Sequence, residues 1–198
     1  MSIPLDRDPF ALYHDWSQVA ASDKRIAEPT AIALATSDSA GMPSVRMVLL
    51  KEVSVGGFVF YTNLNSAKAA DLKANPQAAF CQHWMPLERQ IRVQGRVEAV
   101  SDGEADAYFN SRDRMSRIGA WASHQSSVMP DAWALEKNVA KETARFAVEP
   151  LVRPPHWSGF RIVPSVIEFW IAKPFRLHDR VRFQRTAENG WQAERLFP

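Results

Sequence analysis

Three potential cations alternate in the segment Arg176-Leu177-His178-Asp179-Arg180, which follows the apolar run 167–171. Alternate side chains of an extended chain share one face, so Arg176, His178 and Arg180 would point the same way. Such a group can point into water, pair with carboxylates or face a bound anion. The pattern alone favours the first two interpretations, because exposed charge is ordinary in proteins.

Further basic and hydroxyl side chains stand in apolar or small-residue surroundings, which suits the binding of a phosphate. Arg46 and Lys51 lie at the two ends of an apolar stretch. Lys68 opens a predicted helix, where free N–H groups favour an anion, and the segment 125–127 is a polar cluster. Each feature also has an ordinary interpretation: strand ends in solvent, a helix N-cap and a plain loop.

Tyr108, Arg112 and Ser116 follow one another at intervals of four residues. On a continuous helix this spacing places all three side chains on one face. Such a stripe can hold a phosphate, and it can equally be a solvated helix face. The chain has no GxGxxG or GxxxxGKS/T motif and only eight glycines, so any phosphate must be bound by side chains.

The sequence shows no metal site and no G-x-S-x-G nucleophile motif. The five histidines lack the usual metal-ligand spacings, and they are His14, His83, His124, His156 and His178. Cys81 is the only cysteine, so an internal disulfide is impossible and a reducing compartment fits. We expect no metal.

The bulk composition indicates a globular protein without nucleic-acid or membrane partners. The chain has 198 residues, 46% of them hydrophobic and 23% charged, which suits one domain with a full core. A net charge of +2 gives little overall attraction to nucleic acid. The N-terminus shows no signal-peptide pattern, and no apolar run reaches the roughly 18 residues that span a bilayer. We expect a cytoplasmic protein.

Hydrophobic periodicity and turn signals predict a mainly β fold. Asp8-Pro9 marks a helix start, and Ser101 with Glu104 is a capping-box signal. The predicted helices run from 8 to about 20, 66 to about 75, 101 to about 112 and 130 to about 148. The predicted strands are 31–36, 44–53, 58–62, 78–84, 90–100, 159–163, 166–171, 180–185 and 191–196. This order predicts one domain over 1–198, a closed or nearly closed β-barrel with peripheral helices.

Seven short motifs occur in an order that resembles one enzyme family. They are Arg46-Met47-Val48-Leu49-Leu50-Lys51, Phe60-Tyr61-Thr62-Asn63, Leu87-Glu88-Arg89-Gln90, Ile118-Gly119-Ala120-Trp121-Ala122-Ser123, Gln125-Ser126-Ser127, Ile167-Glu168-Phe169-Trp170 and Arg176-Leu177-His178-Asp179-Arg180. From about Asp8 to Pro198 the chain resembles the pyridoxine/pyridoxamine 5′-phosphate oxidases, FMN enzymes that make pyridoxal 5′-phosphate. No single motif is decisive, but seven in this order are specific.

The resemblance implies an FMN-binding split β-barrel that binds the cofactor at the interface of a homodimer. Carried over by position, the FMN-binding residues would be Arg46, Met47, Val48, Leu49, Leu50, Lys51, Tyr61, Thr62, Lys68, Gln90, Gln125, Ser126, Trp170 and Arg180. The substrate-binding residues would be Lys51, Tyr108, Arg112, Ser116, Arg176, Leu177 and His178. Arg176 and His178 would act at the reacting carbon. Ala67 stands where the family often has Arg, so we expect one contact to the flavin phosphate to be absent.

The implied reaction moves a hydride from C4′ of pyridoxine or pyridoxamine 5′-phosphate to the flavin. Dioxygen then reoxidises the flavin and forms hydrogen peroxide, and the amine substrate also releases ammonia. The alternatives are a related flavin oxidase of another aromatic compound, such as a phenazine precursor, and a non-catalytic FMN- or haem-binding protein. The complete set of substrate residues favours the vitamin B6 substrates.

Overall fold

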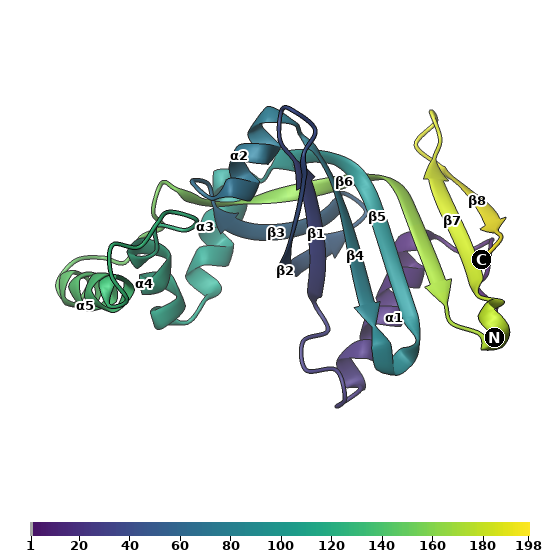
Figure 1. The fold of residues 1–198 in the computed structure, drawn as a ribbon, viewed down its shortest axis with the longest axis horizontal. Helices are drawn as coiled ribbons and strands as arrows, with labels where there is room; N and C mark the ends of the chain where they lie inside the picture. Colours follow the sequence, from purple (N-terminus) through teal and green to yellow (C-terminus); the bar gives the residue numbers. More distant parts are fainter. Residues whose placement is uncertain (1) are drawn as a thin grey trace.

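The computed structural model describes residues 2–198 (Figure 1). The strands are β1 (Ala31–Ser37), β2 (Pro43–Ser54), β3 (Gly57–Asn63), β4 (Gln77–Trp84), β5 (Arg89–Ala99), β6 (Trp157–Ile171), β7 (Asp179–Arg185) and β8 (Trp191–Leu196). The helices are α1 (Pro9–Ser22), α2 (Ala67–Ala74), α3 (Asp102–Ser111), α4 (Arg114–Ala122) and α5 (Ala134–Arg145), with 3₁₀ turns η1 (Met85–Leu87) and η2 (Pro174–Arg176).

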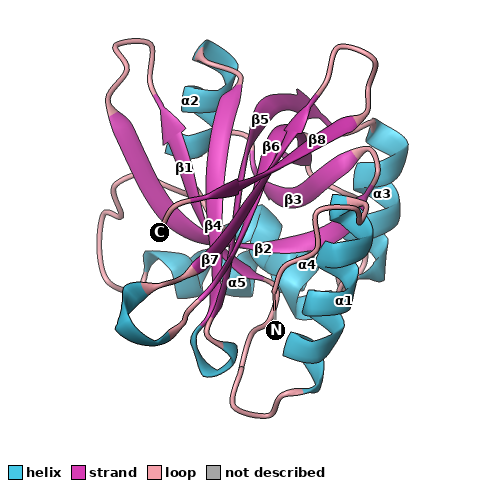
Figure 2. Ribbon diagram, turned by 90° about the vertical axis from the view of Figure 1, so that its right-hand side faces the viewer, coloured by secondary structure: helices cyan, strands magenta, loops and turns pink. Residues whose placement is uncertain are grey.

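All of these strands belong to one sheet, in the order β3-β2-β1-β4-β5-β6-β7-β8. An additional antiparallel pairing joins β3 to β6. It closes the strands β3, β2, β1, β4, β5 and β6 into a barrel. The first half of β6 pairs with β3 and its second half with β7, so β7 and β8 extend beyond the barrel. Helices α4 and α5 lie at the opposite end of the molecule from β7 and β8 (Figure 1), and Figure 2 shows helices around the outside of the strands. The predicted barrel with peripheral helices is confirmed.

One continuous sheet therefore joins the N-terminal and C-terminal parts of the chain. This continuity is consistent with the single domain expected over 1–198, which stays a prediction. Within residues 2–198, no helix has the length and apolar character required to cross a membrane.

Helix α1 packs against the barrel core. The Asp8 side chain accepts the N–H of Ala11 at 2.9 Å, so the predicted N-cap is confirmed. The rings of Phe10 and Tyr13 lie 5.7 and 5.3 Å from the ring of Phe58 inside the barrel. These aromatic contacts fix the helix on the barrel, because each ring buries a large apolar surface.

Strand β6 replaces two predicted strands, 159–163 and 166–171, which is a correction. Its pairing register with β5 shifts between Gln94 and Gly95, where Ser165 is the extra residue. A Cβ at Gly95 would lie 2.1 Å from the carbonyl oxygen of Val163, so glycine allows the two backbones to meet. The bulge also accommodates Pro164, which has no N–H to donate, and the strand continues through it.

The helix predicted from 101 to about 112 is confirmed, so Tyr108, Arg112 and Ser116 do not lie on one continuous helix. Helix α3 ends at Ser111, and Arg112 has an extended backbone with φ −76° and ψ 152°. The side chain of Asp113 then accepts the N–H of Ser116 at 2.8 Å and starts α4, a helix that periodicity did not predict. The strong N-cap residue Asp113 thus starts a new helix, and α3 does not continue. Helix α5 is also shorter than the predicted 130–148.

Candidate active site

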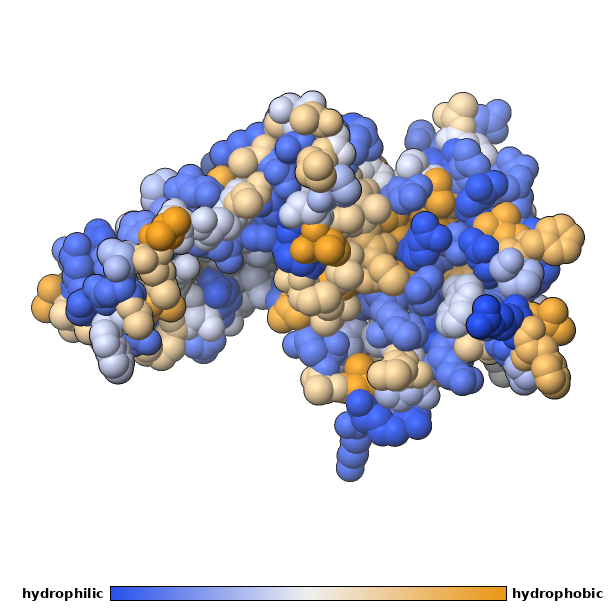
Figure 3. Space-filling view, viewed as in Figure 1, coloured by the Kyte–Doolittle hydropathy of each residue, from blue (hydrophilic) through white to orange (hydrophobic). Residues whose placement is uncertain are grey.

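A cavity of about 830 Å³ lies where β2, β3, α2, α3, α4 and the segment 123–126 meet. In Figure 3 the surface is hollowed between the helical end of the molecule and the barrel. The predicted site residues that line the cavity are Arg46, Met47, Val48, Leu49, Lys51, Tyr61, Thr62, Lys68, Tyr108, Arg112, Ser116, Gln125 and Ser126. The tertiary structure thus brings together residues from segments that are far apart in the sequence.

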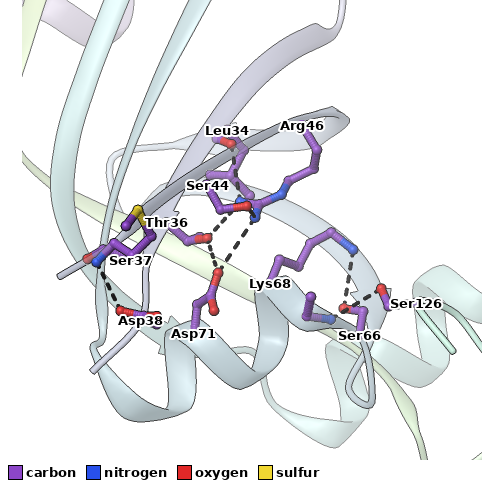
Figure 4. Close-up of polar contacts among 12 residues, drawn as sticks. Leu34, Thr36, Ser37, Asp38, Ser44, Arg46, Ser66, Lys68, Asp71 and Ser126 are labelled. Carbon is purple, nitrogen blue, oxygen red and sulfur yellow. Dashed lines mark hydrogen bonds and ion pairs between the residues drawn. The ribbon is translucent and has the colours of Figure 1, made fainter. Parts of the chain in front are cut away.

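Arg46 on β2 is held at the cavity by neighbours from three elements. Its guanidinium donates to Thr36 Oγ1 at 2.7 Å and to Ser44 Oγ at 2.6 Å (Figure 4). The carboxylate of Asp71 lies 3.6 Å away and accepts the Thr36 hydroxyl at 2.6 Å. Arg46 is therefore oriented by its surroundings before any ligand binds.

Lys68 on α2 is a buried cation without a carboxylate partner among the described residues. The side chain donates to three neutral oxygens, on Gln125 at 3.0 Å, Thr62 at 3.1 Å and Ser66 at 3.2 Å. Burial, and then the nearby charge of Arg46, lower the pKa of Lys68. Two cations that face one cavity with so little compensation favour a bound anion.

The N-terminus of α2 opens into the same cavity. The side chain of its N-cap residue, Ser66, makes no capping bond, and the hydroxyl of Ser126 instead accepts the Ala67 N–H at 3.2 Å. Ser126 has φ 73°, a strained value for a residue with a side chain, and such residues gather at functional sites. The helix N-terminus adds N–H groups to the two cations, which strengthens the case for an anion.

Tyr108, Arg112 and Ser116 line the cavity although the helix breaks between them. The Tyr108 ring stacks on the Tyr61 ring with a centroid distance of 4.1 Å. One guanidinium nitrogen of Arg112 is buried and has no hydrogen-bond partner within residues 2–198. Burial lowers the pKa of Arg112. This arginine is a second position in the cavity at which an anion would gain a partner.

The remaining predicted residues do not line the cavity. Leu50 is only 3% exposed and packs in the barrel core. The second group is Gln90, Trp170, Arg176, Leu177, His178 and Arg180, on β5, β6, β7 and the turn before β7. Within one chain this group lies at the β7 end, away from the helices α4 and α5 (Figure 1).

The second group is ordered within itself. Gln90 pairs with Trp170, and Trp170 pairs with Arg180, so these residues form one row across three strands. The His178 ring lies 4.7 Å from the Trp170 ring. The carboxylate of Glu168 accepts the Arg180 guanidinium at 3.0 Å and holds it in place.

The shared face expected for Arg176, His178 and Arg180 is wrong at its first member. Arg176 lies in η2 with φ 61°, directly after Phe175 with φ 59°, and β7 begins only at Asp179. Positive φ values turn the chain, so side chains do not alternate there as in a strand. Arg176 and Leu177 are exposed, and His178 is half-buried.

Several residues of the site were missed by sequence reasoning. Thr36, Ser44 and Asp71 orient Arg46, and Trp157 lines the cavity beneath Arg112. One signal for Thr36 and Ser44 was available in the sequence. The register of β1 against β2 pairs these two residues with each other, beside Arg46. No local pattern marks Trp157.

Comparison with known proteins identifies the family. The family model "Pyridoxamine 5′-phosphate oxidase" matches residues 19–146. A second model, "Pyridoxine 5′-phosphate oxidase C-terminal dimerisation region", matches residues 157–198. The chain belongs to the pyridoxine/pyridoxamine 5′-phosphate oxidase family. This confirms the resemblance and makes the chain an oxidoreductase of vitamin B6 metabolism.

Relatives in this oxidase family cover the whole chain. The pyridoxine/pyridoxamine 5′-phosphate oxidase of Maricaulis maris is 58% identical over 196 residues, which is 98% of this chain and 88% of the relative. The enzyme of the same name from Rhodospirillum rubrum is 56% identical, with 100% of both chains covered.

Solved structures confirm the split-barrel fold. PhzG from Burkholderia lata, in complex with tetrahydrophenazine-1-carboxylic acid, has a TM-score of 0.90 and 32% identity, with 98% of this chain and 94% of that chain covered. An FMN-binding protein from Nostoc punctiforme, related to pyridoxamine 5′-phosphate oxidase, has a TM-score of 0.78, 17% identity and full coverage of both chains. The second likeness concerns the fold alone.

Proposed function

We propose that this chain oxidises pyridoxine 5′-phosphate and pyridoxamine 5′-phosphate to pyridoxal 5′-phosphate, with FMN as cofactor and dioxygen as electron acceptor. The observation that carries the proposal is one cavity with two desolvated cations, Lys68 and Arg112, that form no salt bridge within the described part of the chain. FMN and the substrate each bring one phosphate, so two such positions match two phosphates.

The FMN phosphate would bind at Arg46, Lys68, Ser126 and the N-terminus of α2, where the cations and N–H groups converge. The polar side chains of Thr62 and Gln125 orient Lys68 toward it. When bound, the flavin supplies the redox chemistry: it accepts a hydride and passes two electrons to dioxygen, which forms hydrogen peroxide. The stretch 46–51 of β2 would lie along the flavin.

The substrate phosphate would bind at Tyr108, Arg112 and Ser116, with Lys51 on the neighbouring wall. Arg176 and His178 would face the reacting C4′ carbon. Nδ1 of His178 accepts the Lys173 N–H at 3.2 Å, so a neutral His178 ring carries its proton on Nε2. That N–H would donate to the substrate and so orient the substrate for loss of the hydride.

A homodimer is part of this proposal, because the second group of residues lies away from the cavity of its own chain. The segment that contains Trp170 and the residues 176–180 falls in the part matched by the dimerisation-region model. Val45 and Met47 on β2, beside the cavity, are 68% and 64% exposed and would be covered by a partner. The cytoplasmic location expected from the sequence stays a prediction.

The second candidate function is oxidation of a phenazine precursor, and the likeness to PhzG from Burkholderia lata favours it. The ligand in that structure is a carboxylic acid, which has no phosphate group. The relatives above 50% identity carry the vitamin oxidase name, and Arg112 with its unpartnered nitrogen suits a phosphate dianion. We therefore place the vitamin substrates first.

The test is turnover in air by FMN-loaded protein. Pyridoxine 5′-phosphate should give hydrogen peroxide and an aldehyde product, pyridoxamine 5′-phosphate should also release ammonia, and unphosphorylated pyridoxine should react poorly. A yellow protein that forms no peroxide with either phosphate would contradict the proposal and favour a flavin-binding protein. Turnover of a reduced phenazine carboxylate alone would favour the second candidate.

A further inference from the structure

We propose that Trp157 is a positioning residue whose indole face holds Arg112 ready for the substrate phosphate. This inference rests on the proposed function, because it takes Arg112 as the phosphate ligand. Trp157 is the first residue of β6, is 6% exposed and lines the cavity. The guanidinium carbon of Arg112 lies 4.9 Å from the centre of its ring, within the range of a cation–π contact.

Arg112 differs from Arg153 and Arg145 in what holds it. Arg153 pairs with Asp102 and Asp106 at 2.7 and 2.6 Å. Arg145, at the C-terminus of α5, pairs with Glu142 and Glu149. Arg112 forms no salt bridge within residues 2–198, and one of its nitrogens is buried without a partner. The Trp157 ring is therefore the support that the structure gives to this guanidinium.

An aromatic support has a different consequence from a carboxylate support. A carboxylate would neutralise Arg112 and compete with an incoming phosphate for the same N–H groups. A ring face attracts the cation from one side and leaves the in-plane N–H donors free for a bidentate contact. Burial, which lowers the pKa of Arg112, also strengthens its attraction to a dianion.

Trp157 is itself fixed from several sides. Its ring is nearly parallel to that of Tyr61, at 5.4 Å and 6°, and meets the edge of Phe109 at 5.3 Å. Its carbonyl oxygen accepts a hydrogen bond of 2.8 Å from Arg153, which α3 anchors through two carboxylates. The helix that carries Tyr108 is thereby tied to the strand that carries Trp157.

Gly159, two residues along β6, makes this stack possible. A Cβ at this position would lie 2.7 Å from a ring carbon of Tyr61 and 3.0 Å from the carbonyl oxygen of Phe60. Glycine therefore lets the Tyr61 ring lie flat against the strand, parallel to Trp157 and to Tyr108. The position of Arg112 follows from this packed aromatic layer and not from an ion pair.

The experiment compares two variants in FMN-loaded protein. Trp157→Phe keeps an aromatic face under Arg112, and Trp157→Met removes it. Losing a desolvated cation–π contact should raise KM for pyridoxine 5′-phosphate by roughly 5- to 30-fold in W157M, with an intermediate rise in W157F. The dissociation constant of inorganic phosphate, measured by calorimetry, should rise by a similar factor. The value of kcat should change little, because a remote binding contact is lost.

Trp121→Met is the matched control. Its ring lies 4.9 Å from the Arg145 guanidinium carbon, but it does not line the cavity and Arg145 has carboxylate partners. W121M should leave KM and phosphate affinity unchanged. A purely structural role of Trp157 would lower the fraction of active enzyme, and hence kcat, without a change in KM.

A double mutant identifies Arg112 as the mediator. In an Arg112→Ala background, W157M should raise KM no further, because the cation that it supports is gone. An unchanged KM and phosphate affinity in W157M, or an equal KM rise with and without Arg112, would overturn the inference. If W157M does not fold, an unchanged KM in W157F would overturn the inference. Absence of oxidase activity in the wild type would contradict the proposed function instead, while the phosphate calorimetry still tests Trp157.

Discussion

Replacing Lys68 by Met should weaken the binding of FMN far more than that of riboflavin, without destabilising the flavin-free protein. Lys68 is 8% exposed, and its bonds go to neutral oxygens of Thr62, Ser66 and Gln125. Burial, and then the charge of Arg46, lower its pKa, so the folded protein tolerates this charge poorly. In the proposed site, this charge would gain its partner when the flavin phosphate binds.

The size of the effect follows from the contact that is lost. A hydrogen bond to a charged group contributes about 1.5–3 kcal/mol, so FMN should bind roughly 10- to 150-fold more weakly in K68M. Riboflavin has no phosphate, so its affinity should change little. In the flavin-free protein, Met removes a desolvated cation, and the free energy of unfolding should stay level or rise.

The pH dependence gives an independent check on the same lysine. A folded-state pKa below the ordinary 10.5 means that the unfolded chain binds the proton more tightly than the folded one. The stability advantage of K68M should therefore be greatest below the folded pKa and should disappear as the pH rises through about 10.5.

The assay is quenching of flavin fluorescence in titrations of flavin-free protein, with thermal unfolding measured in parallel. Lys73→Met is the matched control, because Lys73 is exposed on the same helix and donates to the carbonyl of Leu64. K73M should keep the preference for FMN over riboflavin. An equal loss of both flavins in K68M, or an unchanged FMN affinity, would show that Lys68 does not hold the phosphate.

Three further predictions concern catalysis, assembly and acid stability. Arg112→Ala should mainly raise KM, and Arg176→Ala should lower kcat at saturation; anaerobic stopped-flow flavin reduction at the wild-type rate in R176A would contradict the role at C4′. Light scattering of the FMN-loaded protein should give about twice the 22.3 kDa of one chain, and an active monomer would refute the shared site. Burial alone would raise the pKa of Asp179, but hydrogen bonds from Ile3, Ser2 and Arg195 lower it below 3.8. Its stabilisation should be present above about pH 4 and lost as the pH falls through the folded pKa, so thermal unfolding of D179N should depend less on acid pH than that of the wild type.

Local signals in the sequence were sufficient for many elements of the fold. Asp8 caps α1 and Ser101 opens α3 as predicted, because a cap depends on residues within one helical turn. The predicted strand 90–100 is observed as β5, in which the alternating residues Ile91, Val93 and Val97 are buried. The absence of a glycine-rich phosphate loop also indicated that side chains would supply most phosphate contacts, and basic and hydroxyl side chains line the observed cavity.

Local signals failed where two of them competed. The four-residue spacing would place Tyr108, Arg112 and Ser116 on one face of a continuous helix, whereas α3 ends at Ser111 and Asp113 begins α4. All three still line the cavity. The pattern thus indicated which residues belong together but not the backbone that brings them there.

The sequence by itself determined the types of residue available for chemistry, the caps, the alternating strands and the family to which the chain belongs. Only the tertiary structure decided that Lys68 is buried with no carboxylate partner in residues 2–198, that Trp157 lies under Arg112, and that the row of Trp170 and Arg180 lies away from the cavity. Arg112 and Trp157 are 45 positions apart in the sequence, Lys68 and its partner Gln125 are 57 apart, and β3 closes onto β6 across the barrel. Contacts of that kind depend on how the whole barrel packs, and no short stretch of sequence contains that information.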